Sequence, residues 1–254
     1  MNTVTVKNVV IGEGLPKICV PIVSKTRVEI IEEAKSITDI PVDIVEWRVD
    51  WFEGSNDLKQ IIAVLEDLAP ALNEIPLLFT FRTKREGGEK AIEAASYAAL
   101  NQAVAATGLV DLVDIEIFTG DEIVKSAIEH IHASKVKVIA SNHDFDKTPS
   151  KEDIVERLRK MQDLGADIAK IAVMPNNKLD VLELMAATVI MSEQYARIPI
   201  VTMSMSGIGV VSRLTGEAFG SAITFGSAKK ASAPGQIPVK ELDHVLQLLN
   251  RSMH

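Results

Sequence analysis

DIAKIAVMP, residues 167–175, is a short apolar run with the length of a β-strand and one lysine, Lys170, at its middle. Successive side chains of a strand point to opposite faces, so Ile168, Lys170 and Ala172 share one face. Both faces are apolar apart from the lysine, which is typical of a parallel strand covered on both sides. The stretch therefore predicts a sheet enclosed by helices, with a lysine buried inside it.

The buried lysine has two interpretations. An ammonium group is costly to remove from water, and a neutral amine is a nucleophile that forms a Schiff base with a carbonyl. The alternative is a structural lysine, which reaches past the strand end to solvent or pairs with a carboxylate. The stretch by itself favours neither.

The same pattern of a short apolar run, a turn and a longer helical segment recurs along the chain. Predicted strands cover residues 17–23, 42–48, 76–82, 112–117, 136–142, 167–173, 199–205 and 222–226, after a short hairpin at 3–6 and 9–11. Helical patterns cover residues 28–36, 58–72, 89–107, 122–133, 151–164, 179–195, 210–218 and 239–249. Eight alternating units favour an α/β fold of the (β/α)8 TIM barrel type, formed by residues 1–254 as one domain. A doubly wound open sheet is the competing topology, but no glycine fingerprint follows the first strand.

Composition argues against several classes of partner. The chain has 254 residues and 47% hydrophobic content, enough for a large core, and a net charge of −8. That charge argues against nucleic acid and against an anionic membrane surface, although a basic pocket for a small anion stays possible. No apolar run approaches the roughly 18 residues of a membrane span, and the N-terminus does not resemble a signal peptide. The single cysteine, Cys19, predicts a buried thiol in a cytoplasmic protein.

Charged residues gather at the predicted strand ends, where the active sites of such barrels lie. Burying each charge costs several kcal/mol unless it is paired, so convergence from several strands predicts a site. The alternative is a layer of salt bridges that closes the barrel mouth. Three arginines among these residues suit a ligand carboxylate with hydroxyls nearby. The strand ends and following loops carry Glu46, Arg48, Arg82, Glu86, Asp114, Glu116, His143, Asp144, Lys170, Arg213, Ser232 and Gln236.

Two weaker patterns have simpler explanations. His130-Ile131-His132 could bind a metal, but it lies at a predicted helix end, where histidine suits the helix dipole. Gly207-Ile208-Gly209 opens a helical segment and could meet a phosphate or act as a hinge. No cluster of histidine, cysteine and acidic residues has metal-ligand spacing, so no metal is expected.

Seven short motifs, spread from the first strand to the last helix, resemble those of the type I 3-dehydroquinate dehydratases. They are residues 46–50, 79–82, 86–88, 141–145, 170–175, 202–205 and 231–236. The resemblance implies a (β/α)8 barrel with an N-terminal hairpin closing one end, usually a homodimer. It implies a hydro-lyase that converts 3-dehydroquinate to 3-dehydroshikimate in the shikimate pathway to aromatic amino acids, through a Schiff base and without a cofactor.

The resemblance also implies roles for individual residues. Lys170 would form an imine with the C3 ketone, and His143 would be the general acid–base, held by Glu86. Arg213 would bind the substrate carboxylate. The other matching positions would contact substrate, and residues 229–236 are predicted to form a lid. Those positions are Glu46, Arg48, Arg82, Ser232 and Gln236.

The chemistry agrees with these residue types independently. An iminium acidifies the adjacent C2 proton, and a histidine can remove it and pass it to the departing C1 hydroxyl. A class I aldolase is the nearest alternative, but an aldolase of sugar phosphates should show a phosphate site in the last loops. A non-catalytic binding protein would be expected to have lost Lys170 or His143, and both are present.

Overall fold

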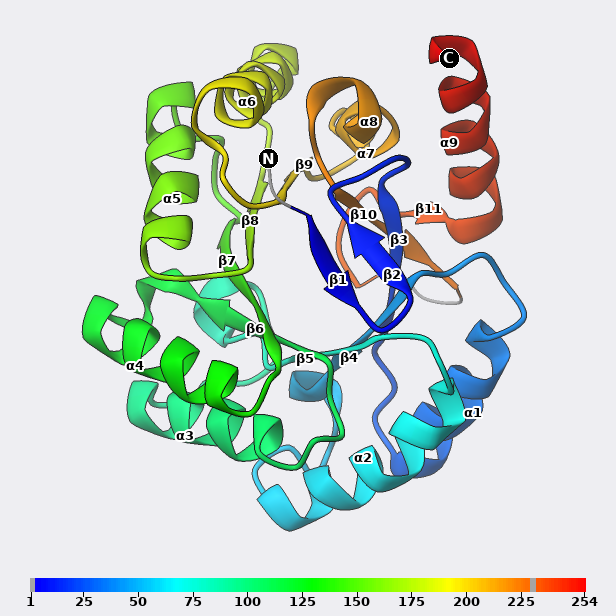
Figure 1. The fold of residues 1–254 in the computed structure, drawn as a ribbon, viewed down its shortest axis with the longest axis vertical. Helices are drawn as coiled ribbons and strands as arrows, with labels where there is room; N and C mark the ends of the chain where they lie inside the picture. The colour runs from blue at the N-terminus through cyan, green and yellow to red at the C-terminus, as the bar shows by residue number, and fades with distance from the viewer. Residues whose placement is uncertain (1–2, 229–231) are drawn as a thin grey trace.

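The computed structural model describes residues 3–228 and 232–254, and within them eight parallel strands form a barrel (Figure 1). Strands that follow one another in sequence pair in space. The ring closes where Ile200 bridges Ser221 and accepts a 2.8 Å hydrogen bond from the backbone N–H of Ala222. The predicted (β/α)8 barrel is therefore confirmed. The strands are β3 (Lys17–Ile22), β4 (Ile44–Arg48), β5 (Leu77–Thr80), β6 (Leu112–Glu116), β7 (Lys137–Asp144), β8 (Ile168–Val173), β9 (Ile200–Ser204) and β10 (Ile223–Ser227), and β11 (Ile237–Pro238) pairs with the end of β10.

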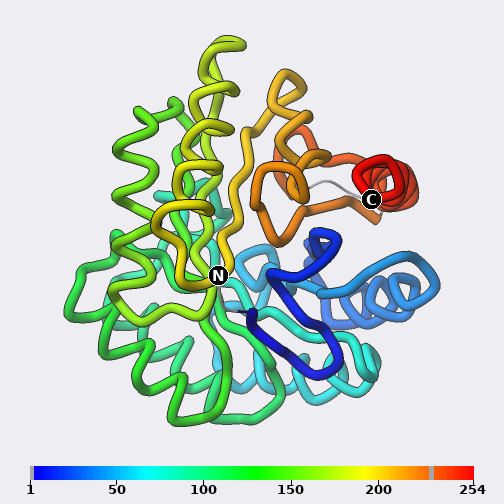
Figure 2. The backbone as a smooth tube through the Cα atoms, turned by 45° about the horizontal axis from the view of Figure 1, so that its top comes forward, coloured from blue at the N-terminus to red at the C-terminus, as the bar shows by residue number. Residues whose placement is uncertain are grey.

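Helices surround the barrel, and Figure 2 shows them as a ring of coils outside the strands. They are α1 (Arg27–Ile37), α2 (Leu58–Leu72), α3 (Ala94–Ala105), α4 (Asp121–Ala133), α5 (Lys151–Asp163), α6 (Lys178–Ile190), α7 (Val210–Leu214), α8 (Gly216–Phe219) and α9 (Val239–Met253). Over the described parts of the chain, no helix combines the length and the apolar character needed to cross a membrane.

The predicted helix at residues 89–107 was wrong at its start. Helix α3 begins at Ala94, because the Glu93 side chain caps it by accepting a hydrogen bond from the Ala95 N–H (2.9 Å). Before that cap, Lys90 bridges Thr83 in an extended segment that lies beside the barrel mouth. A sequence pattern of helix-forming residues did not reveal this tertiary pairing.

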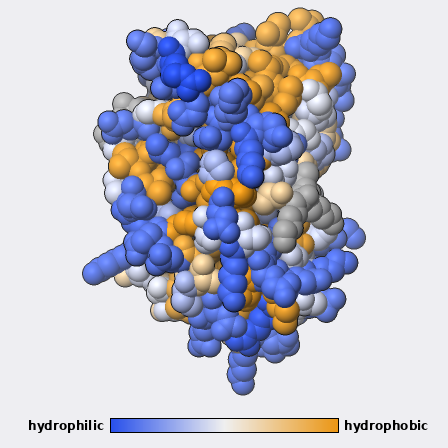
Figure 3. Space-filling model, turned by 90° about the vertical axis from the view of Figure 1, so that its right-hand side faces the viewer, coloured by the Kyte–Doolittle hydropathy of each residue, from blue (hydrophilic) through white to orange (hydrophobic). Residues whose placement is uncertain are grey.

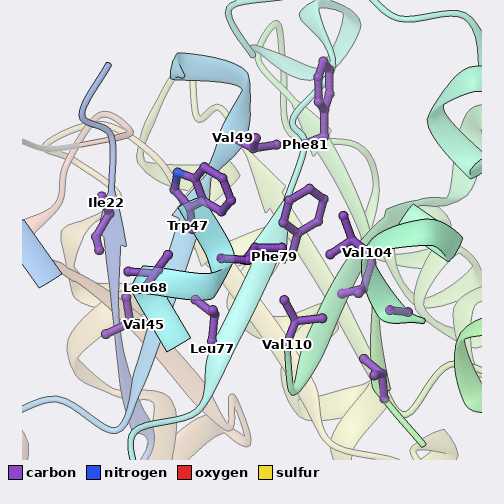
Figure 4. Packing of buried hydrophobic residues seen from close by; sticks show 14 of the residues in the cluster. Ile22, Val45, Trp47, Val49, Leu68, Leu77, Phe79, Phe81, Val104 and Val110 are labelled. Atoms are coloured by element: carbon purple, nitrogen blue, oxygen red, sulfur yellow. The ribbon is translucent and has the colours of Figure 1, made fainter. Parts of the chain in front are cut away.

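An outer core layer fixes which side chains point into the barrel. Trp47 and Phe79 are fully buried on the outer face of neighbouring strands, with ring centroids 5.8 Å apart in an edge-to-face arrangement. Figure 4 shows them packed with Val45 and Leu68. Because side chains alternate along β4, the outward position of Trp47 turns Glu46 to the barrel interior.

The inner core fills the barrel below the mouth, and the hairpin completes it. Strands β1 (Val4–Val6) and β2 (Val9–Ile11) pair antiparallel across the end of the barrel that faces the viewer in Figure 1. Val4, Val6 and Ile11 are buried against residues at the beginnings of the barrel strands. Those residues are Cys19, Ile44, Leu78, Leu112, Ile139 and Ile168. The expectation of a buried thiol is also confirmed, and burial raises the pKa of Cys19.

The hairpin yields a prediction about stability. Ile11→Ala should lower the free energy of unfolding by about 2 to 5 kcal/mol, because it leaves a cavity at the closed end of the barrel. Val10→Ala, at a half-buried position of the same strand, is the matched control and should cost less than about 1 kcal/mol. Urea unfolding of the two variants and the parent measures the difference. Equal losses in both variants would contradict the account of the hairpin as part of the core.

Candidate active site

A cavity opens at the carboxyl end of the barrel strands, and all nine site residues named from the sequence line it. The structure thus brings together residues that lie up to 190 positions apart, from Glu46 to Gln236 (236 − 46). Apolar side chains complete the wall, chiefly Phe145, Met203, Met205 and Phe225. The nine are Glu46, Arg48, Arg82, Glu86, His143, Lys170, Arg213, Ser232 and Gln236.

Lys170 projects from β8 into this cavity. Its strand is buried on both faces as predicted, and its side chain is 5% exposed. Its Nζ lies 3.7 Å from Asp114 Oδ2, 3.9 Å from Glu46 Oε1 and 4.4 Å from the centroid of the Phe225 ring. The lysine therefore both faces carboxylates and lines a cavity, so the two interpretations of the sequence are not exclusive.

His143 and Glu86 form a hydrogen-bonded pair. Glu86 Oε2 lies 3.0 Å from His143 Nδ1 and accepts the backbone N–H of the same residue at 2.9 Å. Because Nδ1 faces Glu86, Nε2 is the ring nitrogen left for a ligand. Burial lowers the pKa of His143 well below its ordinary value, and the positive charges of Arg82, Lys170 and Arg48 add to the effect. The imidazole is therefore neutral near pH 7 and can accept a proton.

The Glu86 carboxyl is itself unusual. Burial raises the pKa of Glu86 to about 8, the negative charge of Glu116 adds to the rise, and Arg82 opposes it. With this pKa, Glu86 holds a proton for most of the time at pH 7. The contact with Glu86 fixes the orientation of the imidazole, and protonation of the carboxyl avoids a full negative charge buried beside it.

Two glycines let the loop after β5 place Glu86 beside His143. Gly87 has a φ of +83°, and a Cβ there would lie 2.2 Å from the Phe145 ring. A Cβ on Gly88 would lie 1.9 Å from the Arg82 carbonyl oxygen. At the motif Glu86-Gly87-Gly88 the loop backbone thus comes so close to its neighbours that only glycine fits.

Two of the three arginines already have acidic partners. Arg82 ion-pairs with Asp114 and Glu116, each at 2.9 Å. Arg48 makes two 2.8 Å hydrogen bonds to the Asp50 carboxylate. Burial lowers the pKa of Arg82, but the carboxylates of Asp114, Glu116 and Glu86 outweigh it and raise the pKa well above its ordinary value.

Arg213 differs from the other two arginines. Its side chain is buried, Nη2 donates to the Pro234 carbonyl (3.2 Å), and Nη1 contacts the Met203 sulfur (3.5 Å). Its Nε is buried without a hydrogen-bond partner, and no carboxylate among the described residues is within ion-pair distance. Burial lowers the pKa of Arg213 to about 10. An unneutralised cation in a cavity marks a place where an anionic ligand group would be stabilised.

The segment from Ser232 to Gln236 lies over the cavity. Gln236 Nε2 donates to Ser232 Oγ (2.9 Å), and Gln236 Oε1 accepts the Ser232 N–H (2.8 Å). Gly235 has a φ of +80° and approaches the Ser206 backbone so closely that a Cβ would lie 2.4 Å from its carbonyl oxygen. The rest of the predicted lid, residues 229–231, lies outside the described residues.

The weaker motifs have structural explanations. His130 and His132 lie in the last turn of α4, where His130 contacts the Ser126 carbonyl and His132 lies 2.7 Å from Asp167. No group of metal-ligating side chains of three or more members occurs among the described residues. Gly209 precedes a helix of only five residues and packs against the Ser204 carbonyl.

Sequence reasoning did not assign Asp114 or Phe225 to the site, although both contact Lys170. Asp114 was noticed only as a charged strand end. The signal that could have identified them is strand alternation, because both occupy inward-facing positions in the middle of their strands. Their distance from Lys170 depends on the tilt and stagger of a closed barrel, which a single strand pattern does not encode.

The family model for type I 3-dehydroquinase matches residues 18–253. A 3-dehydroquinate dehydratase of Clostridioides difficile is 57% identical over 251 residues, 99% of this chain and 98% of that protein. One of Bacillus licheniformis is 53% identical over 250 residues, 98% of each chain.

Two solved structures are similar over their whole length. The type I 3-dehydroquinate dehydratase of Clostridium difficile, with covalently modified comenic acid, has a TM-score of 0.96 and 57% identity, covering 99% of each chain. The 3-dehydroquinate dehydratase of Geobacillus kaustophilus has a TM-score of 0.96 and 37% identity, covering 100% of this chain and 98% of the other.

The raised pKa of Glu86 leads to a prediction about pH. A carboxyl whose pKa is higher in the folded than in the unfolded chain binds its proton more tightly when folded, so stability falls as pH rises from about 4.5 to about 8. Glu86→Gln removes this loss. The free energy of unfolding of the variant relative to the parent should therefore rise by roughly 1 kcal/mol or more across that range.

Urea unfolding at several pH values between 5 and 8 measures the trend. Glu152→Gln, at a side chain that is 72% exposed, is the matched control and should show no such rise. A difference between Glu86→Gln and the parent that stays constant with pH would contradict the description of this carboxyl.

Proposed function

Because this chain belongs to the type I 3-dehydroquinase family, we propose that Lys170, His143 and Glu86 carry out its reaction through a Schiff base. The activity of the chain is the dehydration of 3-dehydroquinate to 3-dehydroshikimate in the shikimate pathway. The observation that carries the assignment of roles is one shared cavity, lined by a lysine, a neutral histidine and an arginine that has no acidic partner among the described residues.

The reaction begins at Lys170. Its amine attacks the C3 ketone, the ketone oxygen leaves as water, and a C=N bond replaces the C=O bond. The resulting iminium withdraws electrons from C2 and acidifies the proton there. His143, neutral at pH 7, takes that proton.

His143 then returns the proton to the C1 hydroxyl, which leaves as water while a C=C bond forms between C1 and C2. Hydrolysis of the product imine regenerates Lys170. Nδ1 carries the ring proton and donates it to Glu86, so Nε2 is free to serve as base in the first transfer and as acid in the second. No group outside the chain is needed for these proton transfers.

Substrate binding follows from the charges of the cavity. Arg213 binds the substrate carboxylate, because its cation has no other anion within reach among the described residues. Glu46, Arg48 and Arg82 contact the hydroxyls and fix the ring. Ser232 and Gln236 cover the bound substrate, and the contact of Pro234 with Arg213 links this cover to the carboxylate site.

A class I aldolase is less well supported by the cavity. A sugar phosphate would need several cations or a helix N-terminus in the last loops. The described parts of those loops offer Arg213, Ser232 and Gln236, a set that suits one carboxylate and hydroxyl groups.

The family resemblance extends to assembly, and we propose that the protein is a cytoplasmic homodimer. Leu179 and Leu182 on α6 are 73% and 60% exposed, and Ile208 and Val211 near α7 are also exposed. Figure 3 shows the side of the molecule on which Figure 1 places α9, and hydrophobic atoms gather over the upper part of that face. A second copy would remove these side chains from water.

The first prediction from this proposal separates imine formation from elimination. Lys170→Ala should lose nearly all turnover and give no covalent species when borohydride is added with 3-dehydroquinate. His143→Ala should lose about 10⁴-fold in kcat, the upper end of what positioned acid–base groups contribute, because one residue serves as base and acid. Its imine can still form and breaks down slowly, so a trapped adduct on Lys170 should accumulate.

Intact-mass and peptide mass spectrometry of the two variants decide between the steps. Lys125→Ala, an exposed lysine on α4, is the control and should react as the parent does. Turnover of His143→Ala within about tenfold of the parent would show that another group, such as Glu86 or Glu46, is the base.

The second prediction concerns assembly. Leu182→Glu should shift the protein from dimer to monomer in analytical ultracentrifugation, since a charge in an apolar interface is costly to desolvate. Leu58→Glu, at a 39% exposed leucine on α2, should leave the mass unchanged. A Leu182→Glu protein that keeps the parent mass would place the interface elsewhere.

A further inference from the structure

Asp114 is a fully buried carboxylate whose two oxygens have different surroundings. Oδ1 accepts a hydrogen bond from Ser141 Oγ at 2.6 Å and lies 2.9 Å from Arg82 Nη2. Oδ2 has no hydrogen-bond partner among the described residues and lies 3.7 Å from Lys170 Nζ. A buried carboxylate oxygen without a donor is costly, so the lysine nitrogen is the group that this oxygen is placed to stabilise.

The carboxylate stays charged in this position. Burial raises the pKa of Asp114, but the positive charges of Arg82 and Lys170 and the hydrogen bond from Ser141 outweigh it, so the pKa lies below its ordinary value. The backbone is fixed as well, because the Tyr97 hydroxyl donates to the Asp114 carbonyl and accepts the Glu116 N–H. A negative charge therefore faces Lys170 from a fixed direction.

Asp114 differs from Glu46, the other carboxylate near the lysine. Glu46 lines the cavity, where it can contact substrate, and its Oε1 already accepts a hydrogen bond from Thr80 (3.0 Å). Asp114 is not among the residues that line the cavity. It contacts the lysine from within the barrel, while the Phe225 ring lies 4.4 Å from the same nitrogen.

We propose that Asp114 is a positioning residue, whose carboxylate, aimed by Ser141 and Arg82, holds the Lys170 nitrogen at the cavity and stabilises the positive charge of its iminium. The nitrogen carries a positive charge before it loses its proton and again once the C=N bond has formed. A fixed anion beside it favours the iminium and so strengthens the electron sink for loss of the C2 proton. The inference rests on the proposed role of Lys170.

Asp114→Asn tests this role with little change in volume. The amide oxygen can still accept from Ser141 and Arg82, but its NH2 group would face the lysine nitrogen and oppose the iminium. We expect kcat to fall about 10- to 100-fold while KM stays within about threefold of the parent, because Asp114 does not contact substrate. With 3-dehydroquinate brought to equilibrium, a brief borohydride pulse should trap a smaller fraction of Lys170 adduct than in the parent.

Glu116→Gln is the matched control. This substitution also removes a buried carboxylate that lies 2.9 Å from Arg82. Because the Glu116 carboxylate makes no ion pair with Lys170, the trapped fraction should stay within about twofold of the parent. Circular dichroism and thermal unfolding establish that both variants are folded. If Asp114→Asn does not fold, Ser141→Ala replaces it, and the loosened carboxylate should lower kcat several-fold at unchanged KM.

The outcomes distinguish this inference from the proposed function. A parent-like kcat and trapped fraction in Asp114→Asn, or in Ser141→Ala where that variant is used, overturns the role of Asp114 and leaves Lys170 untouched. An equal loss of adduct in Glu116→Gln also overturns it, because charge balance around Arg82 would then be the cause. Full turnover in Lys170→Ala would overturn the proposed function itself.

Discussion

The ion pairs of Arg82 are the interaction on which the mouth of the barrel depends. Its guanidinium contacts carboxylates from two different segments, Asp114 and Glu116 at one strand end and Glu86 in a loop. Removing an ion from water costs several kcal/mol, so this many acidic groups could not share a buried space without a central cation. Arg82 thereby sets the directions of the carboxylates that face Lys170 and His143.

Two groups at the barrel mouth that lack full compensation have a proposed chemical role. Within the part of the chain that the structure describes, Arg213 Nε and Asp114 Oδ2 are buried without hydrogen-bond partners. The first faces the expected position of a ligand carboxylate, and the second faces the nucleophile. Glu86 meets the same difficulty by holding a proton, as its pKa of about 8 indicates. The charges of this network are thus paired around Arg82. Its hydrogen bonds are incomplete at Arg213 and Asp114, where a substrate carboxylate and an iminium would supply the missing partners.

Much of the fold could be predicted because each barrel strand is encoded locally. Residues 167–173 read as a strand from apolar alternation alone, and β8 covers Ile168–Val173. The start of α3 could not be predicted in this way, because it depends on the pairing of Lys90 with Thr83. Site residues and the pairing of His143 with Glu86 were identified through family motifs, whereas the partner of Lys170 was not: nothing near Lys170 in sequence indicates that Asp114 lies 3.7 Å away. Likewise, only the family resemblance separated Arg213 from Arg48 and Arg82, because pairing with acids is a property of the closed barrel that no local pattern encodes.

The central claim is that one cavity holds the substrate between Lys170, His143 and Arg213. The most direct test is a crystal structure of the protein after borohydride reduction in the presence of 3-dehydroquinate. The account predicts a covalent bond from Lys170 Nζ to C3 of the ligand, with the ligand carboxylate on Arg213 and the His143 ring beside C2. A ligand bonded to a different lysine, or bonded to Lys170 with its carboxylate away from Arg213, would contradict it.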